Sequence, residues 1–273
     1  MSLQQVVSSA SVRSLWDAAL LRGRSRTLRQ RVKTFLGARP TLFFPLFRLR
    51  PAFSDLLVTR STDLCIEGFP RSANSFAVGA VQHAQPQPID IAHHTHVPAN
   101  AMRACEYGIP TVVLIRPPYD AIVSQIALAK SVRSAETASE SPRQRITFAA
   151  WVHAWRSFYR SLVPDRDHDR LLVVPFAAAI RDMGQVIECV NARFGTDLVP
   201  FDHTEAAVAA VHAERGTHAG PNDRRDQLKA ETRTDFDQAL RADATLRHRM
   251  DAAEQLYAAY VEASPVAVDD PQS

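Results

Sequence analysis

The stretch from Leu64 to Phe76, which reads LCIEGFPRSANSF, predicts the order strand, tight loop, helix. A short apolar run opens it, Gly68 and Pro70 interrupt that run, and a helix-compatible segment begins at Phe76. Such a loop directs backbone N–H groups and the positive end of a helix dipole toward one point, which favours an anion. Arg71 adds a positive charge there. An ordinary strand-to-helix turn with a polar cap is the alternative interpretation.

Three small polar side chains of this loop are predicted to donate hydrogen bonds or to cap the following helix: Ser72, Asn74 and Ser75. The loop is not a Walker A sequence, which requires the pattern G-x-x-x-x-G-K-[ST].

A second stretch, residues 111–124, reads TVVLIRPPYDAIVS and predicts another strand followed by a helix. The buried strand ends at Arg116, which places this side chain where open α/β sheets bind ligands. Prolines are well tolerated in the first helical turn that follows. Asp120 and Ser124 are four residues apart, so they share one face of the predicted helix.

In these residues the chain resembles the sulfotransferase superfamily that uses 3′-phosphoadenosine 5′-phosphosulfate. The family's first signature, similar to PKSGTTW, corresponds to residues 70–76, PRSANSF. The second, similar to R-x-P-x-D-x-x-x-S, is matched at every defined position by residues 116–124. Between the two, the family's KTHLP segment corresponds to residues 94–98, HTHVP. Three signatures in the family's order are far more specific than one.

The resemblance covers roughly residues 63–195 and implies an α/β, P-loop-like three-layer fold with a central parallel sheet flanked by helices. It implies transfer of a sulfuryl group from 3′-phosphoadenosine 5′-phosphosulfate to a hydroxyl or amine of a small-molecule, lipid or carbohydrate acceptor. His96 would be the general base, and Arg71 would stabilise charge on the leaving group. The residues that the resemblance assigns to the nucleotide are Arg71, Ser72, Ala73, Asn74, Ser75, Phe76, Arg116, Ser124, Arg215 and Gly216.

Several positions depart from the family pattern. Arg71 stands where the family has Lys, Ala73 where it has Gly, and Phe76 where it has Trp. Alanine restricts the backbone if the loop needs a positive φ. Arg215 and Gly216 fit the family's R-K-G-x-x-G segment only with one residue inserted, and the pair Arg224 and Arg225 is the alternative for the 3′-phosphate.

Two other functions fit parts of the pattern. A nucleotide-binding protein without turnover would keep the two phosphate loops, and His96 would have no catalytic role. A P-loop phosphotransferase would share the strand-loop-helix anion site, but the Walker lysine and an acidic metal partner after an apolar strand are missing.

The histidines of residues 93–96 raise the question of a metal. His93, His94 and His96 could bind zinc together with Cys105. However, the run lacks a convincing second ligand pair, and His93 and His94 would point to opposite faces of an extended segment. We therefore expect no metal cofactor.

The charge is unevenly distributed along the chain. Residues 1–50 hold ten Arg or Lys and one acid, a net +9, so with +3 overall the remaining residues carry −6. We predict a basic N-terminal arm over residues 1–60, a sulfotransferase-like domain over residues 61–263, and a flexible tail over residues 264–273. The arm would lie on an anionic membrane surface or pack on the domain. Nucleic acid is not expected as a partner, because aromatic residues are not interleaved with the charges.

The start of the chain lacks the charged and apolar regions of a secretory signal, and the three cysteines are odd in number and scattered. These features predict reduced thiols and a cytoplasmic location, with peripheral contact at the inner membrane face if the arm binds lipid. Further along, residues 130–147 are predicted to form a surface loop or lid, and residues 148–162 a helix with an aromatic stripe. Residues 171–176 are predicted to form a buried strand, and residues 183–194 a helix that ends at Gly195.

Overall fold

The computed structural model describes residues 25–48, 55–133, 146–163, 169–215 and 223–266. At its centre lies a sheet of four strands, β1 (Leu64–Gly68), β2 (Ile91–His93), β3 (Thr111–Ile115) and β4 (Leu171–Pro175). Their spatial order is β2-β1-β3-β4, and every neighbouring pair is parallel. All residues of β1, β3 and β4 are buried, as expected for strands that are covered on both faces. The predicted α/β class with a central parallel sheet is therefore confirmed.

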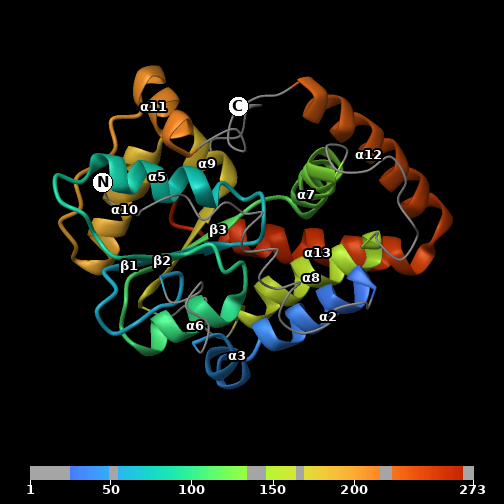
Figure 1. The fold of residues 1–273 in the computed structure, drawn as a ribbon, viewed down its shortest axis with the longest axis horizontal. Coiled ribbons are helices and arrows are strands. Elements are labelled where there is room, and N and C mark those ends of the chain that lie inside the picture. Colours follow the sequence, from blue (N-terminus) through green and yellow to red (C-terminus); the bar gives the residue numbers. More distant parts are fainter. Residues whose placement is uncertain (1–24, 49–54, 134–145, 164–168, 216–222, 267–273) are drawn as a thin grey trace.

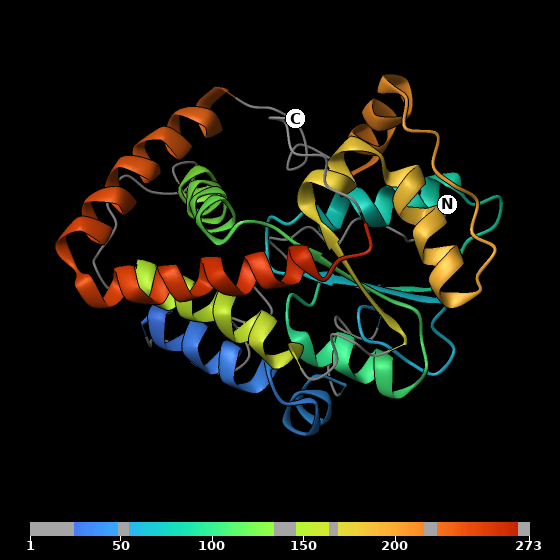
Figure 2. The same ribbon diagram turned by 180° about the vertical axis from the view of Figure 1, so that it is seen from behind.

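Helices cover both faces of the sheet and make three layers (Figures 1 and 2). One face packs against α5 (Asn74–Ala84), α9 (Phe176–Arg181), α10 (Met183–Phe194) and α11 (Glu205–Arg215). The other face packs against α6 (Pro98–Glu106), α7 (Pro118–Arg133), α8 (Phe148–Ser161) and α13 (Ala244–Glu262). The long helix α12 (Asp223–Ala242) joins this second group through contacts with α7 and α13.

Most predicted elements occur where the periodicity placed them. The Val112–Ile115 strand and the helix opened by Pro118 are present, and Gly195 ends α10 with a φ of 69°. Phe176 is the first residue of α9 instead of the last of a strand, because Pro175 adopts the N-cap position. In the predicted lid, α7 continues to Arg133, and residues 134–145 lie outside the described residues.

The basic N-terminal segment contains α2 (Arg26–Gly37) and α3 (Pro40–Phe47). Helix α2 lies along α8, and α3 lies against α6 (Figure 2). Phe43, Phe44 and Phe47 are buried in a cluster that includes residues of β1, β2 and α6. The described part of the segment therefore packs on the body of the protein.

The end of the described chain also packs. The hydroxyl of Ser264 donates to the Val173 carbonyl at 2.8 Å, and Val266 is buried in the core. Residues 264–266 are thus held at positions where the sequence analysis placed a flexible tail. Within the described ranges, no helix is both long and apolar enough to cross a membrane.

Candidate functional site

The candidate site lies at the carboxyl edge of the sheet, where the loops after β1, β2 and β3 meet. The loop after β1 is shaped by two non-glycine residues in the left-handed region, Arg71 and Ala73, each with a φ of 71°. Ala73 is the N-cap of α5, and the first intrahelical bond runs from the Ala77 N–H to the Ala73 carbonyl at 2.9 Å. The N–H groups of Asn74, Ser75 and Phe76 precede that bond and have no backbone acceptor in the described chain. They form the donor set that an anion needs.

The side chains of this loop stabilise the turn and do not cap α5. The sequence predicts that Ser72, Asn74 and Ser75 donate hydrogen bonds or cap α5, and no side chain caps this helix. The Asn74 amide instead donates to the Phe69 carbonyl at 3.1 Å and closes the turn after β1. Ser72 is fully buried. Phe76 packs edge-on against Phe201 in the core, so only its backbone faces the loop.

The loops after β1 and β3 are hydrogen-bonded to each other. The Arg71 Nε donates to the Ser124 hydroxyl at 3.1 Å, and the Arg116 Nη1 donates to the Arg71 carbonyl at 3.0 Å. Two arginines that are 45 residues apart thereby meet at one edge of the sheet. The Arg116 guanidinium also lies 4.2 Å from the Phe176 ring centroid. Burial, the largest cause, lowers the pKa of Arg116, but an arginine remains charged at any physiological pH.

Two aromatic side chains of α8 support these loops from below. The hydroxyl of Tyr159 donates to the Leu114 carbonyl at 2.8 Å and accepts from the Phe69 N–H at 3.3 Å. The Trp155 indole donates to the Arg116 carbonyl at 3.3 Å. Burial raises the pKa of the Tyr159 hydroxyl, which keeps it protonated as a donor. The predicted aromatic stripe of residues 148–162 is part of the core. Its periodicity gave no sign of the hydrogen bonds that Trp155 and Tyr159 make with β3 and the two loops.

The histidine segment is held in place by a carboxylate that sequence reasoning missed. Glu67 is fully buried, and its Oε1 accepts from the Thr95 N–H at 3.0 Å and the Thr95 hydroxyl at 2.6 Å. Its Oε2 accepts from the His96 N–H at 3.1 Å, and the Asn100 amide donates to Oε1 at 3.0 Å. Burial outweighs these hydrogen bonds and raises the pKa of Glu67 to about 7. An acid inside the otherwise apolar strand LCIEG was the signal that could have found it.

His96 lies at the same edge of the sheet as the loop after β1. Its φ is 52°, and its Nδ1 is 3.0 Å from the Gly68 carbonyl. Because a carbonyl only accepts, Nδ1 must carry the hydrogen, and Nε2 is then the nitrogen with the lone pair. This is the tautomer that a general base acting through Nε2 requires.

His94 contacts the first turn of α5. Its Nε2 lies 2.8 Å from the Ser75 hydroxyl, and its Nδ1 lies 2.6 Å from Nδ1 of His93. The expectation that His93 and His94 point apart is wrong, because His94 has a φ of 60° and the segment is not extended there. Among the described residues, no group of three or more His, Cys, Asp or Glu side chains is arranged to hold a metal.

Asp120 lies close enough to Arg116 to counter, by charge attraction, part of the lowering of its pKa by burial, whereas neither Arg224 nor Arg225 takes part in the hydrogen bonds that join the two loops. Asp120 pairs with Arg233 at 2.8 Å and ties α7 to α12. Arg215 is the last residue of α11, and Gly216 lies outside the described residues. Of the alternative pair on α12, Arg224 is exposed and Arg225 is buried.

The fold and the site define a parallel α/β protein in which two strand-to-helix loops are hydrogen-bonded to each other at the carboxyl edge of the sheet. No family model matches the sequence, and no curated protein matches it. Among solved structures, the chain is similar to mouse sulfotransferase SULT7A1 complexed with PAP, with 13% sequence identity and a TM-score of 0.37. That similarity covers 59% of this chain and 67% of the other.

Proposed function

We propose that the protein is a sulfotransferase that uses 3′-phosphoadenosine 5′-phosphosulfate and sulfates a hydroxyl or amine of a small-molecule, lipid or carbohydrate acceptor. The observation that carries this proposal is the hydrogen-bonded union of the two signature loops. Arg71 bonds Ser124, and Arg116 bonds the backbone of Arg71. An ordinary strand-to-helix turn would not need two arginines linked across adjacent loops at the ligand-binding edge.

The donor set suits the two charged ends of this nucleotide. Arg71 and the N–H groups at the start of α5 would hold the 5′-phosphosulfate, because they combine a fixed positive charge with a helix dipole. Arg116 and Ser124 would hold the 3′-phosphate. Since Arg71 already donates to Ser124, the two phosphate sites would share one hydrogen-bonded frame. Such a frame fixes the nucleotide and thus the reacting distance.

His96 would act as the general base. The acceptor oxygen or nitrogen attacks sulfur, and the new bond forms as the bond from sulfur to the bridging oxygen breaks. The acceptor proton moves to Nε2 of His96, and the electron pair of the broken bond leaves with 3′-phosphoadenosine 5′-phosphate. Arg71 and the loop N–H groups stabilise the negative charge on the leaving oxygen. Glu67 positions His96 through its backbone N–H.

Calorimetric titration with 3′-phosphoadenosine 5′-phosphate tests the nucleotide site. We expect micromolar binding to the wild type and a loss of tenfold or more, about 1.4 kcal/mol, in Arg116→Ala. Arg241→Ala removes an exposed charge on α12 and is the matched control. Absence of binding, or equal affinities in wild type and Arg116→Ala, would overturn the proposal.

Turnover separates an enzyme from a binding protein. With a sulfated acceptor identified by screening, His96→Ala should retain nucleotide affinity and lose roughly 10²- to 10⁴-fold in rate. An unchanged rate would remove His96 from the mechanism. A protein that binds the nucleotide tightly yet sulfates no member of a broad acceptor panel would favour nucleotide binding without turnover.

A further inference from the structure

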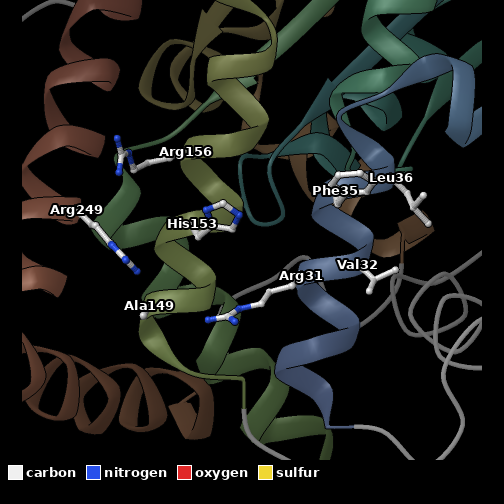
Figure 3. Close-up of a pocket in the computed structure, with 8 residues that line it drawn as sticks. All are labelled: Arg31, Val32, Phe35, Leu36, Ala149, His153, Arg156 and Arg249. Atoms are coloured by element: carbon white, nitrogen blue, oxygen red, sulfur yellow. The ribbon is translucent and has the colours of Figure 1, made fainter.

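A groove of about 640 Å³ is lined by residues of α2, α8 and α13 (Figure 3). Its lining consists of Arg31, Val32, Phe35, Leu36, Ala149, His153, Arg156 and Arg249. The residues of α8 that line it differ from Trp155 and Tyr159, which face the loops. The groove is therefore a separate surface of the same helix.

Three helices each contribute an arginine to this groove. Arg31 comes from α2, Arg156 from α8 and Arg249 from α13, and His153 lies among them. Figure 3 shows Arg31 and Arg249 extending toward the part of α8 that carries Ala149 and His153. No acidic side chain belongs to the described lining, so the local charge is strongly positive.

The arginines and the histidine act on one another. The pKa of His153 is lowered, first by burial and then by the positive charges of Arg31, Arg249 and Arg156. Burial, followed by Arg160 and Arg249, lowers the pKa of Arg156. No acid contributes to either shift. Like charges on one surface repel one another, and a bound anion would offset that repulsion.

Arg156 also has a donor that the described residues leave unused. Its Nε is buried and lacks a hydrogen-bond partner among them. A buried donor of a charged group destabilises the folded state when it is not hydrogen-bonded. An anion in the groove would provide the acceptor.

The opposite part of the lining is apolar. Val32, Phe35, Leu36 and Ala149 complete the groove, and Phe35 is 52% exposed. A purely inorganic anion would leave these side chains in water, whereas an ester would cover them and gain free energy by burial.

We propose that this groove binds a phosphate or sulfate monoester, with its dianionic or anionic head on Arg31, Arg156 and Arg249 and its apolar group against Val32, Phe35 and Leu36. The arginine forks match the oxygens of such a head. The head could belong to a soluble ester or to an anionic lipid, because the chemistry that recognises it is the same.

Proton NMR of the His153 ring, assigned with His153→Gln, gives a readout confined to the groove. Phenyl phosphate should shift this resonance saturably and raise the pKa of His153, and inorganic phosphate should bind at least tenfold more weakly. Arg156→Gln and Arg249→Gln should each weaken phenyl phosphate at least tenfold. Arg247→Gln removes an exposed charge from the same helix and should bind like the wild type. Circular dichroism checks that each variant folds.

Sedimentation with vesicles distinguishes the two sources of the head group. Binding to phosphatidic acid vesicles, but not to phosphatidylcholine vesicles, that is lost in Arg156→Gln and kept in Arg247→Gln identifies a lipid. Binding of phenyl phosphate without vesicle binding identifies a soluble ester. The proposal is overturned if phenyl phosphate at millimolar concentration leaves His153 unshifted, or if Arg247→Gln and the groove variants bind alike. Because the reporter is His153, a failure here leaves the nucleotide site unaffected.

Discussion

At the scale of the residue, Glu67 is a buried carboxylate whose hydrogen bonds hold the histidine segment in place. It is a fully buried acid in the strand that ends at the phosphate loop, and it receives hydrogen bonds from Thr95, His96 and Asn100. The same carboxylate thereby connects β1, the histidine segment and α6. Without it, four donors from these three residues would lose their acceptor, at about 1–3 kcal/mol for each unsatisfied group.

The raised pKa of Glu67 predicts a pH dependence of stability. An unfolded glutamate titrates near 4.5, whereas the folded group titrates near 7, so the folded state holds the extra proton between these values. The free energy of unfolding should therefore fall as pH rises from 5 to 8, by up to about 3 kcal/mol from this group. Urea unfolding of wild type and Glu67→Gln at both pH values checks this. The wild type should lose stability relative to the variant, and parallel pH profiles would contradict the assignment.

At the scale of the element, the start of α5 combines strain with exposed donors. Ala73 occupies the left-handed region at the helix N-cap, where a β-carbon costs roughly 1–2 kcal/mol. This conformation directs the N–H groups of Asn74, Ser75 and Phe76 toward the site. The strain is thus located where the proposed function needs a fixed donor set.

The same substitution at two positions of this element should have opposite effects. Ala73→Gly relieves the strained φ and should raise the free energy of unfolding by roughly 0.5–1 kcal/mol. Ala80→Gly, at a fully buried position in the interior of the same helix, should lower it by about 1–2 kcal/mol, since glycine is a poor helix former and a buried methyl group is lost. Chemical denaturation measures both. Destabilisation by Ala73→Gly would argue against the left-handed backbone.

At the scale of the whole molecule, the basic N-terminal segment is joined to the α/β body by aromatic packing. Phe43 is fully buried and stacks on Phe47 at 4.6 Å between ring centroids, within the cluster beneath β1 and β2. Helix α2 also forms one wall of the arginine groove. The segment therefore packs on the body of the protein and also lines the proposed binding groove.

If the segment is part of the cooperative unit, loss of its anchor should destabilise the whole molecule. Phe43→Ala should lower the free energy of unfolding by about 3–5 kcal/mol in a single transition. Phe35→Ala, at an exposed position of α2, should cost less than about 1 kcal/mol. Thermal unfolding followed by circular dichroism compares the two. An unchanged main transition in Phe43→Ala would mean that the segment unfolds independently.

Local sequence patterns were sufficient to predict the buried strands and the loops that follow them. Apolar runs bounded by Gly and Pro predicted β1, β3 and β4, because a strand buried on both faces needs a continuous apolar sequence. The strand-loop-helix order also predicted Arg71 in the loop after β1 and Arg116 at the ligand-binding edge of the sheet, and the structure shows that the two meet. The assignment of the nucleotide to these residues, and the roles of Arg215 and Gly216, stay predictions.

Only the tertiary structure decided the rest, because it depends on contacts between distant residues. The hydrogen bonds of Glu67 to the histidine segment span 28 residues or more, and those of Tyr159 to β3 and to the loop after β1 span 45 and 90. The left-handed backbone that brings His93 and His94 together is likewise invisible to a periodicity argument. The arginine groove is the extreme case, since each of its three helices supplies one charge and none forms a motif alone. Sequence patterns fix local conformation, whereas the pairing of side chains is fixed by how the finished layers pack.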